Sequence, residues 1–412
     1  MTNDAVTHAS AGTIFKNFVR VLPGAILIAV TLSTGSCDQR GGGIFGTATS
    51  SSTNTGTITV TPTSTASPGA AAFVSNYADG SVSSFTRSAS NGSLSLVTTI
   101  GAGAANGPEG LAVSQANNAV YAVNYSDGNI YEYSIDPTTG AISKQSPASI
   151  GNNNGGVASG PEQILINSAD SLSGNQFAWV TGTADGSINV YSVDPTTGQL
   201  TFNGRGTGFT SPLGMAFQAV GSGGYLYVAD SGTGLIHSYS VTPSNGGLAE
   251  VAGSPVPSLS SGGGTPALLV FDSTNSRLYV DDNVNGIVTA FGATNGVLGY
   301  LTQSAAAPGN SLFGMALTSL STGEFLYTAN QAANTLWSFV VPALNPPMVC
   351  AGSSFLSAPT GIVADSTNTY AYVTNQNNGT VSQFTLSGTS CPVYNGYVST
   401  GGNGPYGIVL TH

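Results

Sequence analysis

Two glutamates hold equivalent places in a repeated motif, and they are the first candidates for chemistry. Glu109 follows Pro108, and Glu162 follows Pro161 in the next copy of the motif. A pair of carboxylates can divide general-acid and general-base work between them, or it can bind a cation. Carboxylates in loops also commonly accept backbone hydrogen bonds without any chemical role. If neighbouring copies lie side by side, Glu109 and Glu162 are predicted catalytic residues of one site.

A histidine inside the repeats is the third catalytic candidate. His237 carries an imidazole, which titrates near neutral pH and often serves as a general base. It stands two residues before Tyr239, so both side chains would point to one face of a strand. A histidine that is packed and hydrogen-bonded between repeats would show the same spacing. The sequence leaves both roles open.

Motifs for metals and cofactors do not stand out. Asp281 and Asp282 follow an expected strand where other copies carry a single Asn or Asp. Such residues commonly cap turns through the local backbone, and a metal site is the alternative. The sequence shows no nucleophile elbow, phosphate-binding loop, zinc-ligand spacing or dinucleotide fingerprint. We therefore expect no cofactor and no metal.

The secondary-structure elements that must position these candidate residues belong to a repeated pattern between Ala71 and His412. A turn glycine is followed two residues later by an aliphatic residue and five residues later by an aromatic one. The copies are Gly80-Val82-Phe85, Gly128-Ile130-Tyr133, Gly186-Ile188-Tyr191, Gly234-Ile236-Tyr239, Gly286-Val288-Phe291, Asn334-Leu336-Phe339 and Gly379-Val381-Phe384. Several of these glycines belong to Asp-Gly or Asn-Gly pairs, which predict type I′ hairpins between β-strands.

A second motif has the same period and predicts the innermost strands. It reads Pro-x-Gly-aliphatic in its clearest copies, which begin at Pro108, Pro212, Pro359 and Pro405. A period near 50 residues with several strands per unit is typical of propeller blades. The sequence therefore predicts an all-β fold, a propeller of seven four-stranded blades. Because the last copy has no strands after it, the C-terminal strand should complete the first blade and close the ring.

The composition and net charge of the chain limit the classes of partner that it can bind. Only 6% of residues are charged, and 18 acidic residues outnumber 7 Lys and Arg, which gives a net charge of −11. Nucleic acid is an unsuitable partner, because its recognition needs a basic surface. An anionic membrane surface would also repel the chain. We expect a monomer that meets a membrane only through an N-terminal lipid anchor.

The N-terminal region resembles an export signal. Lys16 and Arg20 precede the apolar run 21–32, and small residues lead to Cys37 as in a bacterial lipobox, with Thr34 in the usual place of Leu. We predict a signal peptide over residues 1–37 with lipidation of Cys37, a flexible tether rich in Gly, Ser and Thr over 38–70, and the propeller over 71–412. A conventional signal peptide without lipidation is the alternative. Cys350 and Cys391 then remain as an even pair that could form a disulfide in an oxidising compartment.

Short motifs in the repeats resemble two related propeller families. The segment 372–381, which reads YVTNQNNGTV, resembles the YVTN-type repeat of bacterial and archaeal surface proteins. The DPTTG segments at 136–140 and 194–198 resemble the strand-linking turns of lactonase-family propellers, which include 6-phosphogluconolactonases. The resemblance covers about residues 71–412 and implies a seven-bladed propeller with lactone-hydrolysing relatives.

The same resemblance implies an Arg-His pair after the proline of an inner strand in active members. Here those places hold Glu109-Gly110, Glu162-Gln163, Leu213-Gly214, Ala267-Leu268, Thr360-Gly361 and Tyr406-Gly407. Since Arg and His are absent there, the sequence favours an exported, lipid-anchored module of the periplasm or cell surface that binds an envelope protein or glycan. The alternative is a hydrolase of a sugar lactone or related lactone that uses Glu109, Glu162 and His237.

Overall fold

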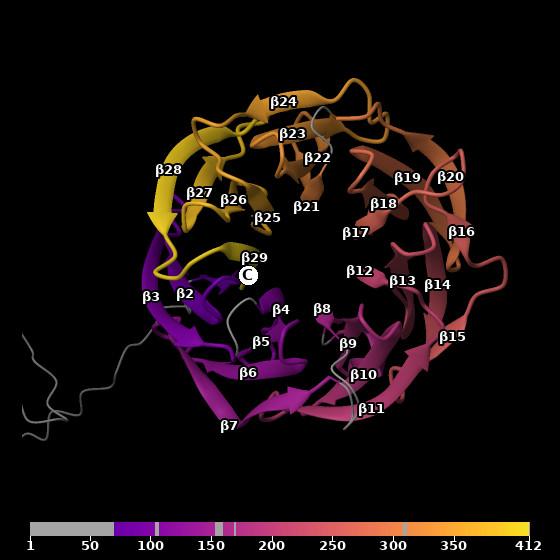
Figure 1. Ribbon diagram of the computed structural model, residues 1–412, viewed down its shortest axis with the longest axis horizontal. Helices are drawn as coiled ribbons and strands as arrows, with labels where there is room; N and C mark the ends of the chain where they lie inside the picture. Colours follow the sequence, from indigo (N-terminus) through magenta and orange to yellow (C-terminus); the bar gives the residue numbers. More distant parts are fainter. Residues whose placement is uncertain (1–69, 104–106, 153–159, 169, 308–310, 412) are drawn as a thin grey trace, which may run out of the picture. The chain divides into compact units, whose positions relative to one another are not determined.

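Seven antiparallel sheets form a closed ring in the computed structural model, which describes residues 70–103, 107–152, 160–168, 170–307 and 311–411. Figure 1 shows the sheets arranged like blades around a central axis, with the start of each blade at the centre. The predicted signal peptide, Cys37 and nearly all of the predicted tether lie outside the described residues, and these predictions remain untested. No helix in the described ranges is long and apolar enough to cross a membrane.

The blades are numbered here in chain order, each from its inner strand outward. Blade 1 contains β29 (Pro405–Leu410), β1 (Ala71–Asn76), β2 (Ser81–Arg87) and β3 (Leu94–Gly101). Blade 2 contains β4 (Pro108–Ser114), β5 (Ala119–Asn124), β6 (Asn129–Ile135) and β7 (Ile142–Gly151). Blade 3 contains β8 (Pro161–Ile166), β9 (Phe177–Gly182), β10 (Ser187–Val193) and β11 (Leu200–Thr207).

The remaining blades follow the same order. Blade 4 contains β12 (Pro212–Val220), β13 (Gly223–Asp230), β14 (Leu235–Val241), β15 (Leu248–Glu250) and the short β16 (Val256–Pro257). Blade 5 contains β17 (Pro266–Asp272), β18 (Arg277–Asp282), β19 (Ile287–Thr294) and β20 (Val297–Gln303). Blade 6 contains β21 (Leu312–Leu320), β22 (Gly323–Asn330), β23 (Thr335–Val340) and β24 (Met348–Ala351). Blade 7 contains β25 (Pro359–Ala364), β26 (Tyr370–Asn375), β27 (Thr380–Thr385) and β28 (Val393–Ser399).

The ring closes as the sequence predicted. The C-terminal strand β29 pairs with β1, the first strand of the propeller, and supplies the inner strand of blade 1. Blade 1 therefore joins the two ends of the repeat region through a ladder of backbone hydrogen bonds. The predicted seven-bladed all-β fold is confirmed.

The predicted turn type was wrong, although the glycines are placed as expected. The hairpin after β1 has four residues between the paired Asn76 and Ser81. Gly80 has a φ of 69°, and its N–H donates to the Asn76 carbonyl over 3.1 Å, whereas Asp79 keeps a negative φ. A type I′ turn would need two successive residues with positive φ. The four-residue loop needs a positive φ only at its last residue. This explains why Asn334, with a φ of 53°, can replace glycine in blade 6.

Large side chains between the blades form the core. Each apolar cluster spans two neighbouring blades, as where Tyr121 and Ile130 of blade 2 meet Val180 and Tyr191 of blade 3. Some polar atoms at these interfaces find partners in the adjacent blade: the Trp179 indole N–H, for example, donates to the Gly246 carbonyl over 3.0 Å. Aromatic groups with one polar atom can therefore be buried at a blade interface without leaving that atom unpaired.

Close packing of the inner strands explains the Pro-x-Gly motif. A Cβ placed on Gly407 of β29 would lie 2.5 Å from the Glu109 carbonyl oxygen of β4. The Ser75 hydroxyl bridges the same two strands, since it donates to that carbonyl over 2.7 Å and accepts from the Gly407 N–H over 2.8 Å. The glycine is needed because neighbouring inner strands meet backbone to backbone around the axis.

Replacement of this glycine is expected to destabilise the ring. We expect Gly407→Ala to lower the free energy of unfolding by about 1–3 kcal/mol, because the new methyl group must push β4 away. Urea unfolding followed by tryptophan fluorescence would measure the change. Gly299→Ala in β20 is the matched control: no heavy atom lies within 4 Å of its Cβ position, so the effect should stay within about 0.5 kcal/mol. Equal losses in both variants would refute the packing explanation.

Candidate functional site

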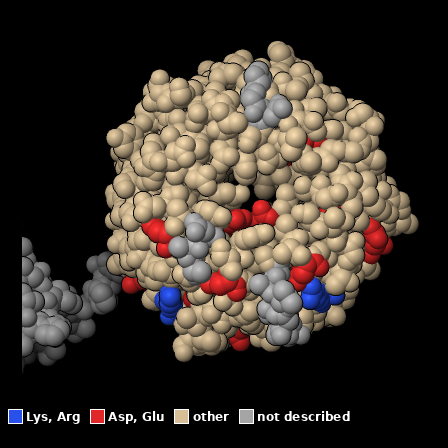
Figure 2. All heavy atoms as spheres, viewed as in Figure 1, with Lys and Arg blue, Asp and Glu red and all other residues tan. Residues whose placement is uncertain are grey.

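The second residues of the seven inner strands form a ring at the mouth of the central channel. They line a cavity of about 260 Å³ together with residues that follow them. The ring consists of Glu109, Glu162, Leu213, Ala267, Phe313, Thr360 and Tyr406. In blade order, Thr360, Tyr406, Glu109 and Glu162 are consecutive, so one side of the mouth is polar and the other is apolar. Figure 2 shows a central hollow with acidic atoms at its rim.

Glu109 is a buried carboxyl group that holds its proton at neutral pH. Its side chain is 7% exposed, and Oε2 has no hydrogen-bond partner among the described residues. Burial, with the charge of Glu162 as a second cause, raises the pKa of Glu109 from 4.5 to about 8. Glu109 can therefore donate a proton at pH 7.

Glu162 is the second carboxyl group of the mouth, on β8 beside β4. Burial raises its pKa as well, but the hydroxyl of Thr183 lies 2.8 Å from Oε2 and lowers the pKa in part. A hydrogen bond to the charged form favours ionisation. The two carboxyl groups thus differ: Glu109 holds its proton more strongly, and Glu162 is better suited to accept one. The structure brings these two predicted residues together.

Aromatic side chains at the mouth were not predicted as site residues. The Tyr406 ring lies 6.1 Å from that of Tyr77 and 6.2 Å from that of Phe313. Burial, followed by the charges of Glu109 and Glu162, raises the pKa of Tyr406 well above its usual value, so its hydroxyl stays protonated. The alignment of the Pro-x-Gly copies contained the signal, because Tyr406 and Phe313 hold the same position as the glutamates.

His237 lies away from the channel. It belongs to β14, the third strand of blade 4, and is not among the residues that line the mouth. Its Nδ1 lies 3.1 Å from a carboxylate oxygen of Glu250, and its ring contacts Phe209 at 5.1 Å between centroids. The structure therefore does not join His237 to the glutamates, and packing explains its position.

The paired aspartates have structural partners. Asp282 accepts hydrogen bonds from the Thr265 N–H and the Asn285 N–H, both over 2.9 Å, and so caps a turn. Asp281 accepts from the Leu268 N–H over 2.6 Å, which ties β17 to β18. Within the described ranges, no group of three His, Cys, Asp or Glu side chains is placed to hold a metal.

Cationic side chains are missing from the described lining of the mouth. Arg87 pairs with Asp365 at 3.1 Å, and Arg205 pairs with Asp185 at 2.6 Å, both outside that lining. Figure 2 shows basic atoms near the outer edge of this face and acidic atoms at its centre. An anionic ligand would thus meet the Glu162 carboxylate without a compensating cation.

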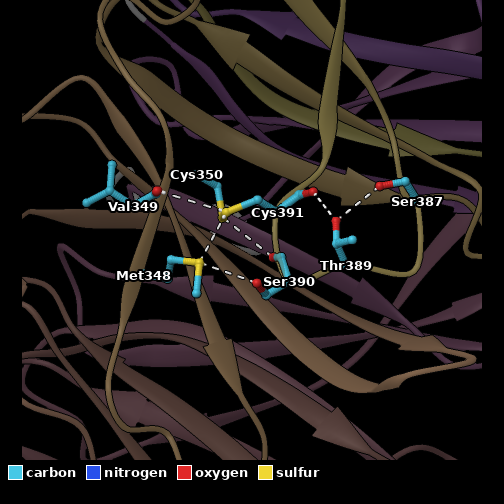
Figure 3. The surroundings of a disulfide bond; sticks show 7 residues. All are labelled: Met348, Val349, Cys350, Ser387, Thr389, Ser390 and Cys391. Atoms are coloured by element: carbon cyan, nitrogen blue, oxygen red, sulfur yellow. Dashed lines mark hydrogen bonds between the residues drawn. A yellow bond between two sulfur atoms is a disulfide. The ribbon is translucent and has the colours of Figure 1, made fainter.

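A disulfide links blades 6 and 7. Cys350 of β24 is bonded to Cys391, which lies two residues before β28 (Figure 3). The Cys391 Sγ also lies 3.5 Å from the Met348 sulfur. Neither cysteine lines the cavity at the mouth, so the role of the bond is to fasten two blades together.

Comparison with known proteins gives one family and many similar folds. The sequence profile described as "Lactonase, 7-bladed beta-propeller" matches residues 46–155 and 217–395. A candidate 6-phosphogluconolactonase from Bacteroides fragilis has a TM-score of 0.67 at 18% identity, with 85% of this chain and 99% of that chain covered. The periplasmic gluconolactonase of Pseudomonas aeruginosa has a TM-score of 0.65 at 19% identity, with coverages of 83% and 99%. No curated protein matches the chain.

Proposed function

This chain belongs to the lactonase family of seven-bladed β-propellers, and on that premise we propose that it hydrolyses a small, uncharged lactone at the channel mouth. One observation carries the proposal: two carboxyl groups on adjacent inner strands, a buried one that is protonated and a half-buried one that is better able to ionise. Pairs of titratable groups whose environments move their pKa values apart are typical of acid–base catalysis. The names of the similar structures, which refer to lactonases, support the same substrate class.

The proposed reaction uses each carboxyl group once. The Glu162 carboxylate takes a proton from water as the water oxygen bonds to the lactone carbonyl carbon. The bond between that carbon and the ring oxygen then breaks, and Glu109 gives its proton to the departing oxygen. The product is an open-chain hydroxy acid. Exchange with solvent removes the proton from Glu162 and returns one to Glu109.

Tyr406 positions the substrate in this scheme. Because its pKa is raised, its hydroxyl stays protonated at neutral pH and can donate a hydrogen bond to the lactone carbonyl. Phe313 and Leu213 supply the apolar side of the mouth, against which the carbon atoms of the ring can pack. The two-sided mouth thereby suits a molecule with a polar ester group and an apolar ring edge.

The family match supports the hydrolase more strongly than the envelope-binding module that the sequence favoured. The loss of the Arg-His positions argues against a phosphorylated substrate, yet it leaves the carboxylate pair intact. Export to the periplasm or cell surface and lipidation of Cys37 remain part of the proposal. The Cys350–Cys391 disulfide supports export, because such bonds persist mainly in oxidising compartments.

Substrate charge provides the test. In a proton-release assay with the purified full-length protein, we expect kcat/KM for δ-valerolactone to exceed that for 6-phosphogluconolactone at least about tenfold at low salt, since the Glu162 carboxylate repels the phosphate. The difference should shrink as salt screens the charges. A preference for the phosphorylated lactone would overturn the substrate assignment. No catalysed hydrolysis of either compound would overturn the proposed function.

A further inference from the structure

Below the glutamates, the channel wall is apolar. The fourth and fifth residues of the inner strands follow the mouth ring inward along the axis. They contribute Leu111, Met315, Ile362, Ile408 and Val409 to the cavity that also contains Glu109 and Glu162. The polar groups of this cavity are thus concentrated at one end, and aliphatic side chains surround the other.

A second cavity adjoins this apolar wall. It has a volume of about 590 Å³ and shares Leu111 and Val409 with the first cavity. Val113, Ile164, Ile166 and Val363 extend its lining along β4, β8 and β25, which surround the axis in Figure 1. Glu109 and Val113 are four residues apart on one strand, or about 13 Å at 3.3 Å per residue. The aliphatic wall is therefore long enough for a chain of several carbon atoms.

The far end of the second cavity is polar again. Gln115, Asn167, Asp170 and Gln176 line it beyond the aliphatic segment. As at the mouth, no Lys, Arg or His lines this cavity among the residues that the structure describes. An apolar segment bounded by polar groups at both ends suits an uncharged aliphatic chain and would disfavour a polyhydroxylated sugar, whose hydroxyl groups would lose their hydrogen bonds to water.

We propose that the ligand of this channel is a lactone with an aliphatic side chain, its ring at Glu109 and Glu162 and its chain along Leu111 and Val409. That the lactone ring is hydrolysed rests on the proposed function. That the ligand carries an aliphatic side chain rests on the apolar channel alone. Each fully buried methylene group contributes about fourfold to affinity. A pentyl chain that is about half buried should therefore improve kcat/KM roughly 30-fold over the unsubstituted ring.

The first experiment compares two δ-lactones. Hydrolysis of δ-valerolactone and of δ-decalactone, which carries a pentyl group, is followed by proton release with the full-length protein. We expect δ-decalactone to be preferred roughly 30-fold. Equal kcat/KM values for the two lactones would overturn the inference that the ligand carries an aliphatic side chain, while leaving the proposed hydrolase in place.

A second readout separates the two proposals. Calorimetric titration with piperidin-2-one and 6-pentylpiperidin-2-one, the lactams of the same shapes, measures binding without turnover. If neither lactone is hydrolysed but the pentyl lactam binds at least about tenfold tighter, the apolar channel is a ligand site and the hydrolase proposal fails. If both lactams bind equally, the inference about the chain is overturned as well.

Channel-filling variants locate the effect. Val363→Phe narrows only the second cavity, so it should abolish the preference for the pentyl compounds while δ-valerolactone hydrolysis changes little. Val409→Phe narrows both cavities, so it should also abolish the preference and should weaken binding of both lactams. Val297→Phe is the matched control, since Val297 lies on the outer strand β20 and is 47% exposed. Thermal unfolding of each variant confirms that the fold is kept. If both channel variants keep the preference, as Val297→Phe should, the proposed place of the ligand's aliphatic chain is wrong.

Discussion

Glu162→Gln is expected to lower kcat/KM for δ-valerolactone by about 10²–10⁴-fold, the usual contribution of a general base. The amide has nearly the shape of the carboxylate but cannot accept the proton of the attacking water. The hydrogen bond with Thr183 can persist, since the amide oxygen also accepts from the hydroxyl at 2.8 Å. The loss should therefore appear in turnover, measured by proton release, and the stability of the fold should be preserved.

The same substitution at a distant glutamate is the control. Glu250 is exposed and lies beside His237, 3.1 Å from its Nδ1, away from the channel. Glu250→Gln should leave hydrolysis unchanged if the mouth carboxylates do the chemistry. A loss of activity in Glu250→Gln together with normal activity in Glu162→Gln would transfer the catalytic role to His237.

Removal of the disulfide is expected to have the largest effect on stability. Cys350 and Cys391 are 41 residues apart, and closing a loop of that size stabilises a fold by about 4 kcal/mol through the entropy of the unfolded chain. We expect the Cys350→Ser/Cys391→Ser double variant to lose roughly 3–4 kcal/mol in urea unfolding. The loss arises because the unfolded chain gains conformational entropy when the bond no longer closes this loop.

Reduction of the natural chain supplies the matched comparison. Dithiothreitol should lower the unfolding midpoint of the natural chain toward that of the double variant and should leave the double variant unchanged. Hydrolysis by the folded double variant should be normal, because the disulfide does not line the mouth. Equal stability of the oxidised natural chain and the double variant would show that the bond does not stabilise the propeller.

The repeats made the fold predictable from the sequence. Turn glycines and Pro-x-Gly segments recur at a fixed period, and the unpartnered last copy predicts ring closure by β29. Local spacing did not predict the turn type, because Asp-Gly occurs both in two-residue turns and at the end of longer loops. Gly80 shows the latter case, with a positive φ that Asp79 does not share.

The candidate site was predictable only in part. Glu109 and Glu162 were found because equivalent positions of neighbouring blades must meet at the axis. Tyr406 and Phe313 hold the same position but were not predicted, since aromatic side chains in these repeats are also typical of the core. The distance of His237 from the glutamates could not be predicted, because strand periodicity indicates the face on which a side chain lies and not how far its strand is from the axis. The raised pKa of Glu109 depends on burial that is visible only in the folded ring.

The pH dependence of lactone hydrolysis tests the central claim most directly. Glu109 must be protonated and Glu162 ionised, so kcat/KM for δ-valerolactone should fall above about pH 8, where Glu109 loses its proton, and should also fall in acid as Glu162 gains one. Glu109→Gln should be slower by about 10²-fold and should lack the alkaline fall, because its amide does not ionise. After correction for spontaneous hydrolysis, these two profiles would support the carboxylate pair. An unchanged alkaline fall in Glu109→Gln, or a natural chain whose rate stays level through pH 8, would contradict it.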